Sequence, residues 1–344
     1  MPHKELPIPP HFDPQKVDQV WQVPYQQRAD AALEWAEQHN IQPAYQDSVR
    51  IRLMLVDVQN TFCLPGFELY VAGRSGTGAI DDNRRLCDFI YRNLDLITQI
   101  CPTLDTHQAL QIFHSLFLVD KQGQHPVPYT LVSEADVEQG IWRVNPAVAR
   151  SLGVTESYAQ EYLLHYVRQL RAGGKYDLTI WPYHAMLGGV GHALVSAVEE
   201  AIYFHSVARF SQPDFQIKGD NPFTENYSVL KPEVLEDADE NIIAQKNTRF
   251  IELLVQSDVV IIAGQAKSHC VAWTIGDLLD ELMLEDERLV TKVYLLEDCT
   301  SPVVIPDVVD YTAQADAAFQ RFSDAGMNVV RSVDPLENWP GLRL

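Results

Sequence analysis

Residues 260–274 read VIIAGQAKSHCVAWT, a buried-strand pattern that runs directly into a cysteine and then a predicted helix. The apolar run at 259–262 predicts a central parallel strand, and Gly264 allows a sharp turn into a following helix. Cys270 then falls where that helix should begin. A thiol at a helix N-terminus has a lowered pKa, and the free backbone N–H groups of the same turn can bind an oxyanion. The position therefore suits a nucleophile, although a Cys can also serve as a small buried hydrophobe.

Two further predicted strands end in a charged residue. In IRLMLVDVQNTF, residues 51–62, a buried strand is followed by Asp57, and a short strand at 215–217 ends at Lys218. Catalytic groups gather outside the carboxyl ends of strands in open α/β sheets. Each residue has an ordinary alternative, because Asp57 can cap a turn and Lys218 can be solvated. Together with Cys270 they would supply a base, a cation and a nucleophile.

The order of elements predicts the fold class and the organisation of the chain. Strands alternate with helices from about residue 51 onward, which indicates an α/β fold: a three-layer, doubly wound, mostly parallel sheet with helices on both faces. Residues 1–48 hold a Pro-rich lead and one helix at 26–39, and we expect an N-terminal arm that covers the domain or a neighbouring subunit. We expect residues 49–344 to form the main domain, with an insertion at 120–175.

Three segments resemble the isochorismatase-like cysteine hydrolase superfamily, which includes the nicotinamidases. They are DVQNTF at 57–62, IKG at 217–219 and AGQAKSHCV at 263–271, and the similarity runs from about residue 50 to 326. The resemblance implies the isochorismatase-like hydrolase fold and an Asp–Lys–Cys triad formed by Asp57, Lys218 and Cys270. It also implies a cis peptide before Ala266, with the N–H groups of Ala266 and Cys270 as the oxyanion hole.

A metal site is the next expectation. Asp105 and His107 are two residues apart and point the same way if the segment is extended. This DxH pair and the later WPYH segment at 181–184 resemble the nicotinamidase pattern, which implies one divalent ion bound by Asp105, His107 and His184. Mixed carboxylate and imidazole ligands suit Zn, Fe(II) or Mn. His114 and His125 lie between the two segments, and either is a further ligand or simply solvated.

The resemblance also shapes the expected substrate. Phe62, Trp181 and Tyr227 are candidate walls of a pocket for a flat molecule, although aromatic residues more often belong to the core. The leading hypothesis is a cysteine amidohydrolase that cleaves a small, planar, nicotinamide-like amide to the acid and ammonia through a thioester on Cys270. The alternatives are a metal-independent carbamoyl or ureido amidohydrolase of the same superfamily, and a non-catalytic ligand-binding or scaffolding member.

Composition narrows the class of protein. The chain has 344 residues, a formal net charge of −21 and 46% hydrophobic residues, so it can build a large core and has no basic patch for nucleic acid. The five cysteines have no paired spacing, which is typical of reduced thiols. We expect a cytoplasmic enzyme without organic cofactor or membrane contact, since no apolar leader or span is evident. The sequence is compatible with a homo-oligomer.

Overall fold

The computed structural model describes residues 5–343, and its centre is a six-stranded sheet in the order β12-β9-β8-β1-β2-β7. Every pairing between neighbours in this sheet is parallel. The doubly wound α/β class predicted from the sequence is therefore confirmed. The strands are β1 (Ile51–Val56), β2 (Gln99–Asp105), β7 (Gln216–Lys218), β8 (Val259–Gly264), β9 (Val293–Leu296) and β12 (Asn328–Val330).

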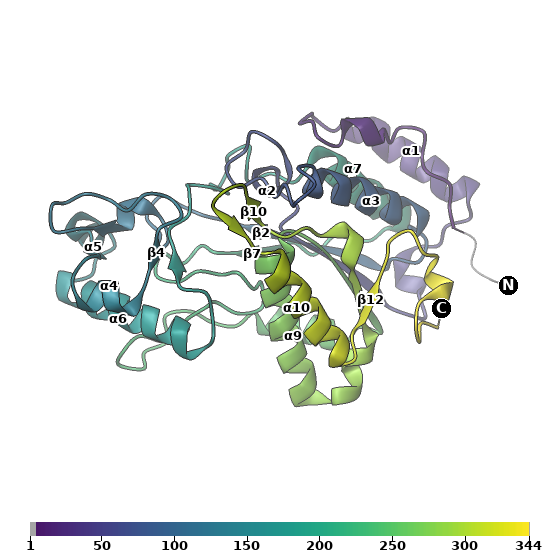
Figure 1. The fold of residues 1–344 in the computed structure, drawn as a ribbon. Helices are drawn as coiled ribbons and strands as arrows, with labels where there is room; N and C mark the ends of the chain where they lie inside the picture. The colour runs from purple at the N-terminus through teal and green to yellow at the C-terminus, as the bar shows by residue number, and fades with distance from the viewer. Residues whose placement is uncertain (1–4, 344) are drawn as a thin grey trace.

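Helices cover both faces of this sheet because alternate residues of each strand point to opposite sides. In β1, Leu53 and Leu55 belong to one apolar cluster, whereas Met54 and Val56 belong to the other. The first cluster includes α3 (Gly78–Arg92) and α7 (Ser196–Arg209), and the second includes α8, α9 and α10. Figure 1 shows the sheet between these two layers. The second-layer helices span Thr248–Val255 (α8), Ala272–Glu285 (α9) and Thr312–Asp324 (α10).

The N-terminal arm packs on its own domain. Helix α1 (Tyr25–Gln38) lies against α7, where Arg28 forms an ion pair with Glu200 at 2.5 Å. Just before the helix, the backbone N–H of Trp21 donates to Ser196 Oγ, and that hydroxyl donates back to the Trp21 carbonyl, both at 3.0 Å. The expected arm therefore contacts its own domain through α1 and Trp21. Residues 1–4 of the expected arm lie outside the described residues.

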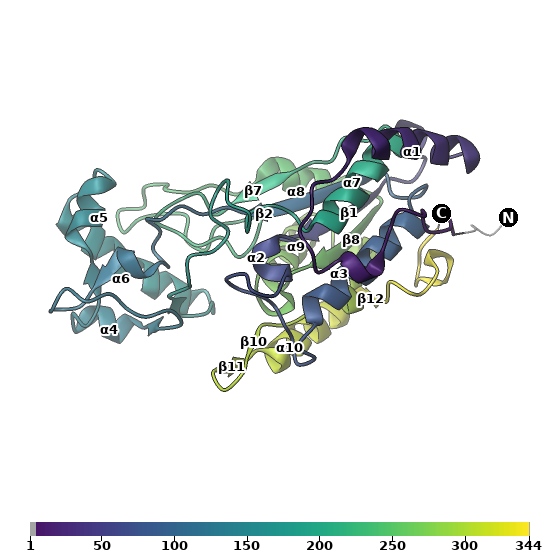
Figure 2. The same cartoon turned by 90° about the horizontal axis from the view of Figure 1, so that it is seen from above.

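The segment between β2 and α7 forms a lobe beside the sheet, visible in both Figure 1 and Figure 2. It has its own apolar cluster, which includes Ile112, Tyr166 and Trp181 and extends past both ends of the insertion expected at 120–175. Val234, from the long segment after β7, belongs to the same cluster. The elements of the lobe are β3 (Leu118–Val119), β4 (Leu131–Val132), α4 (Glu134–Glu138), β5 (Arg143–Val144), α5 (Pro146–Ser151), α6 (Glu156–Ala172) and β6 (Leu178–Thr179).

The remaining elements are short. They are α2 (Asn60–Cys63), a hairpin of β10 (Val304–Ile305) and β11 (Val309–Asp310), a π-helical turn at Lys267–Val271, and 3-10 turns at Pro14–Lys16, Ala44–Gln46, Ser115–Phe117, Glu287–Lys292, Glu297–Cys299 and Leu336–Asn338. Within residues 5–343, no helix combines the length and the apolar character that crossing a bilayer requires.

Candidate active site

Three strand ends bring the predicted triad together. Asp57 follows β1, Lys218 ends β7, and Cys270 lies in the π-helical turn between β8 and α9. Lys218 Nζ is 3.0 Å from Asp57 Oδ2 and 3.6 Å from Cys270 Sγ. All three side chains are buried. Three residues that are far apart in the sequence thus meet at one edge of the sheet.

The backbone around this edge requires specific residues. Gly264 ends β8 with a φ of +118°, and a Cβ at this position would lie 2.1 Å from the carbonyl oxygen of Val56. Only glycine fits there, so the turn that carries Cys270 can approach the end of β1. Asp57 itself has a φ of +47°, a left-handed conformation that Asp tolerates better than most residues. Its backbone N–H donates to Thr103 Oγ1 at 3.0 Å, and that hydroxyl donates to Asp57 Oδ1 at 2.5 Å.

The thiol is held in its protonated form. Burial raises the pKa of Cys270 well above its ordinary value, and Lys218 offsets this only in part. The carboxylates of Asp57 and Asp105 raise the pKa of Cys270 further. The sequence-based expectation of a thiolate stabilised by a helix N-terminus is therefore wrong for the resting protein, because desolvation and two nearby carboxylates outweigh the favourable charge.

Asp57 and Lys218 form the electrostatic partners of this thiol. Burial raises the pKa of Asp57, while the Lys218 ammonium acts against that rise. For Lys218, burial alone would lower the pKa, but Asp105 and Asp57 outweigh it and raise the value well above the ordinary one. Lys218 is therefore a permanent cation. Asp57 is the group next to Cys270 that can accept a proton.

Of the triad, Cys270 lines a cavity of about 340 Å³. Ala266 and Cys270 both line it, and the peptide bond between Gln265 and Ala266 is cis. All three candidate wall residues, Phe62, Trp181 and Tyr227, line the same cavity, and Trp181 Nε1 donates to Tyr227 Oη at 3.0 Å. The volume is at the lower end of the range for small-molecule sites. A small, flat molecule suits these dimensions and walls.

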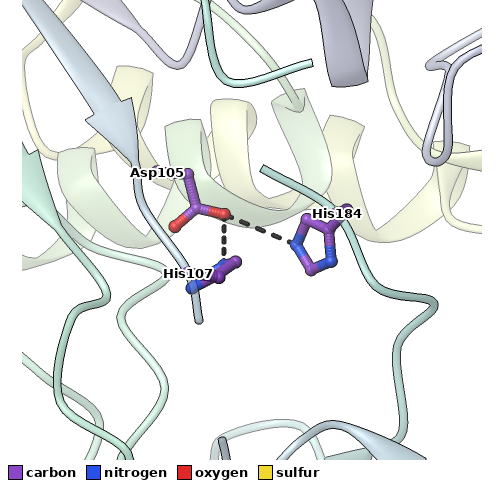
Figure 3. Close-up of side chains that lie close together, drawn as sticks. All are labelled: Asp105, His107 and His184. Atoms are coloured by element: carbon purple, nitrogen blue, oxygen red, sulfur yellow. Dashed lines mark hydrogen bonds and ion pairs between the residues drawn. The ribbon is translucent and has the colours of Figure 1, made fainter. Parts of the chain in front are cut away.

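Asp105, His107 and His184 form the second part of the site (Figure 3). One potential ligand atom from each lies within 4.8 Å of the others, and all three residues are buried. Asp105 Oδ2 is 2.7 Å from His107 Nε2 and 3.5 Å from His184 Nε2. The three residues expected from the DxH and WPYH segments therefore converge on one point.

Hydrogen bonds from the Nδ1 atoms of His107 and His184 fix the orientation of the two imidazole rings. His107 Nδ1 donates to the Gly219 carbonyl at 3.1 Å, and His184 Nδ1 donates to the Pro182 carbonyl at 2.8 Å. A carbonyl can only accept, so each Nδ1 carries the proton and each Nε2 faces Asp105. This is the outer hydrogen bonding typical of metal-binding histidines. The donor set therefore fits a divalent cation.

His114 gives a further test of that fit. It is fully buried, and neither of its ring nitrogens has a hydrogen-bond partner among the described residues. Its ring centroid lies 5.9 Å from that of His107 and 6.0 Å from that of His184. Burial, with the nearby His184 and His107, lowers its pKa to about 3, which keeps the imidazole neutral as a metal ligand must be. His125, in contrast, is exposed and bonds through Nδ1 to the Leu118 carbonyl.

No family model and no curated protein matches this sequence. Among solved structures, a nicotinamidase/pyrazinamidase of Acinetobacter baumanii aligns over 84% of this chain and 99% of its own, at 18% identity and a TM-score of 0.50. This chain has the nicotinamidase fold. The yeast nicotinamidase aligns over 81% and 99% (19% identity, TM-score 0.49), and the zinc complex of Pyrococcus horikoshii pyrazinamidase over 82% and 99% (17%, 0.43). The isochorismatase-like hydrolase fold expected from the sequence is confirmed.

Among the cavity residues that were not singled out from the sequence are Glu225 and His269. Glu225 lines it, and burial raises the pKa of this carboxyl to about 7, against the effect of the nearby His107. His269 also lines it, directly before Cys270. The first comes from the long segment after β7, where the sequence carries no strand or helix periodicity to place it. His269 directly precedes the predicted nucleophile, and this position in the sequence could have identified it as a cavity residue.

Proposed function

We propose that this protein is a cysteine amidohydrolase that cleaves a small planar amide to a carboxylic acid and ammonia. The observation that carries the proposal is the meeting of Asp57, Lys218 and Cys270, with the Cys270 thiol at the wall of a cavity lined by aromatic side chains. A binding module has no need of a base, a cation and a thiol at three separate strand ends. The combination suits nucleophilic catalysis with an adjacent general base.

In the first half of the reaction, Cys270 attacks the amide carbon. Asp57 takes the thiol proton as the C–S bond forms, so the thiolate exists only when the substrate is in place. The carbonyl oxygen becomes negative and is stabilised by the N–H groups of Ala266 and Cys270. Asp57 then gives the same proton to the amide nitrogen, the C–N bond breaks, and ammonia leaves. A thioester remains on Cys270.

In the second half, water attacks the thioester carbon. Asp57 takes a proton from the water, and the same oxyanion donors stabilise the second intermediate. The C–S bond then breaks, Cys270 recovers its proton from Asp57, and the carboxylic acid is released. Lys218 stays protonated throughout, which holds the buried Asp57 carboxylate in place whenever it is charged.

Asp105, His107 and His184, with His114 beside them, would hold one divalent ion of the Zn, Fe(II) or Mn type. Such an ion would supply a Lewis acid next to the cavity, suited to a ring nitrogen of the substrate. Because Asp105 and His184 also line the cavity, that nitrogen and the scissile amide can occupy it together. The site therefore favours a heteroaromatic amide.

Ammonia release from nicotinamide, pyrazinamide and a panel of aliphatic and ureido amides tests the proposal. The fold shared with the Acinetobacter protein makes nicotinamide and pyrazinamide the first substrates to try. We expect turnover that Cys270→Ala removes and that a chelator lowers. Cys87→Ala, a buried thiol in α3 outside the cavity, is the matched control and should keep its activity. Undiminished turnover by Cys270→Ala would refute the mechanism.

A further inference from the structure

Gln265 directly precedes Ala266, whose N–H is one of the two oxyanion donors in the proposed mechanism. Gln265 is fully buried, and its backbone N–H donates to the Val56 carbonyl at 2.8 Å. The position of the Ala266 N–H depends on Gln265, because the two residues share one planar peptide unit. Oxyanion donors stabilise a transition state best when they are held in place before the reaction. The contacts that hold Gln265 therefore bear on catalysis.

The side-chain amide of Gln265 is held at both ends. Its Oε1 accepts the Ser301 N–H at 3.2 Å, and its Nε2 donates to Asp82 Oδ2 at 2.8 Å. A backbone N–H can only donate and a carboxylate can only accept, so this orientation of the amide satisfies both partners. The Ser301 carbonyl in turn accepts the Lys267 N–H at 2.8 Å. Residues on both sides of Ala266 are thus tied to Ser301, and Asp82 adds a contact from α3.

Asp82 is a buried carboxylate that accepts hydrogen bonds on both oxygens. Oδ1 accepts from Arg85 Nη2 at 2.9 Å, Oδ2 accepts from Gln265, and only 3% of the side chain is exposed. Burial raises the pKa of Asp82 to about 6, against hydrogen bonds from Ser301 and Gln265. Above that pH the group is charged, and hydrogen bonds to a charged acceptor are the stronger ones. Among the described residues that line the cavity, neither Asp82 nor Gln265 appears, so Asp82 can affect the reaction only indirectly.

A glycine at the start of α3 allows the helix to come this close to the oxyanion turn. Gly78 is the first residue of α3, and a Cβ there would lie 2.7 Å from Ser301 Oγ and 2.9 Å from the Ala72 carbonyl oxygen. Asp82 follows four residues later, on the same face of the helix. Gly78 therefore lets α3 approach Ser301 and brings the Asp82 carboxylate to Gln265.

We propose that Asp82 is a positioning residue that holds the Ala266 N–H in the oxyanion hole through the side chain of Gln265. The inference rests on the proposed amidohydrolase function and adds to it a residue of α3 outside the cavity. Without this contact the amide of Gln265 is held at one end only, and the Ala266 N–H is less well placed. The effect falls on the negatively charged intermediates, so kcat should fall while KM changes little.

Asp82→Asn and Gln265→Leu test the proposal in the metal-loaded full chain, at about pH 8, where Asp82 is ionised. An Asn at 82 offers one oxygen, so its NH₂ group faces the donor of either Gln265 or Arg85. We expect each variant to lower kcat for the amide that is hydrolysed fastest by about 10- to 100-fold, somewhat less than the loss of a whole oxyanion donor. KM and the affinity for the carboxylic acid product should stay within about threefold.

The aldehyde that corresponds to this amide reports on the oxyanion hole directly. Cys270 Sγ bonds to the aldehyde carbon while Asp57 takes the thiol proton, so the former carbonyl oxygen becomes an alkoxide at the oxyanion position. The inhibition constant of the aldehyde should therefore rise in Asp82→Asn by about the factor by which kcat falls. A residue with a purely structural role would weaken binding of the aldehyde and of the acid product alike.

Asp88→Asn is the matched control. This carboxylate also lies on α3 and pairs with an arginine, Arg92, at 2.8 Å, but 42% of its side chain is exposed. It should keep its kcat. If Asp82 acts through Gln265, the double variant Asp82→Asn/Gln265→Leu should lose no more activity than Gln265→Leu alone. Additive losses, an unchanged kcat in Asp82→Asn, or a fall in kcat matched by an equal loss of product affinity would each overturn the proposal.

Failure of the proposed function gives a different result, because the unmodified chain itself would then release no ammonia from any amide. Hydrogen exchange of residues 265–271, with β9 as the internal reference, tests the positioning role in either case. Loss of one hydrogen bond to a buried carboxylate should speed exchange in Asp82→Asn by about 10- to 100-fold, and Asp88→Asn should exchange like the unmodified chain. Equal exchange in the three proteins would overturn the inference independently of catalysis.

Discussion

Lys218 Nζ and Asp105 Oδ1 are 2.8 Å apart, and this contact joins the triad to the histidine cluster. The other oxygen of Asp105 faces His107 and His184. Although burial alone would raise the pKa of Asp105, His107 and Lys218 outweigh it and hold the value well below the ordinary range. Asp105 is therefore a permanent carboxylate that contacts both the triad and the histidine cluster. We expect a substitution in either group to change the electrostatics of the other.

Lys218→Met should destabilise the fold as well as abolish activity. The substitution leaves Asp57 and Asp105 buried without their common cation, and breaking a buried ion pair from one side costs about 3–5 kcal/mol. Urea unfolding followed by circular dichroism measures the loss. A change below about 1 kcal/mol would show that the ammonium does not neutralise these carboxylates.

Divalent ions should bind the histidine cluster and stabilise the fold. At a free concentration of 100 times Kd, ligand binding to the native state adds about 2.7 kcal/mol to the free energy of unfolding. We expect Zn, Fe(II) or Mn to raise the melting temperature of the chelated protein. His184→Ala and His114→Ala should weaken this effect, whereas His125→Ala, at an exposed position, should not. An equal shift in all three variants would place the ion elsewhere.

The sequence was sufficient to predict the strand ends and the groups they carry. Asp57 follows an apolar run, Lys218 ends a short alternating strand, and Cys270 follows the turn after a second apolar run. Parallel strands align their carboxyl ends, so local pattern and topology agree. The state of the thiol was not predictable, because the pKa of Cys270 depends on burial and on Asp105, which lies on a different strand. Glu225 was missed for a similar reason, since only the packing of the lobe brings its segment to the cavity.

Gly264→Ala should distort the backbone at the end of β8 and so displace the turn that carries Cys270. A methyl group at this position would overlap the Val56 carbonyl, and the φ of +118° is unfavourable for any residue with a Cβ. We expect a marked loss of stability and activity. Gly276→Ala is the control, because a Cβ at this position in α9 would contact Arg321 and Phe322 at ordinary distances. Alanine also has a higher helix propensity than glycine, by up to about 1 kcal/mol. Thermal unfolding of both variants checks the contrast.

Acid should destabilise the protein through His205. Burial lowers the pKa of His205 to about 4, although the hydrogen bond from Nε2 to the Ile97 carbonyl acts in the opposite direction. In the unfolded chain a histidine has a pKa of about 6.5. The unfolded state therefore takes up the proton first as the pH falls. The corresponding stability is present above pH 6.5 and is lost by pH 4, a change of about 3 kcal/mol.

His205→Gln keeps a donor for the Ile97 carbonyl but does not titrate. Its free energy of unfolding should fall less steeply between pH 6.5 and 4 than that of the unmodified chain. His125→Gln, an exposed change, should leave the slope as it is. Parallel pH profiles for all three proteins would mean that His205 is not the group responsible.

The decisive measurement is the covalent state of Cys270 during turnover. Intact-protein mass spectrometry after rapid acid quench, with nicotinamide or whichever amide of the panel releases ammonia fastest, should detect an acyl group. Peptide mapping should place it on Cys270, and the adduct should be absent from Cys270→Ala. Ammonia release with full activity in Cys270→Ala, or an acyl group on another residue, would contradict the account.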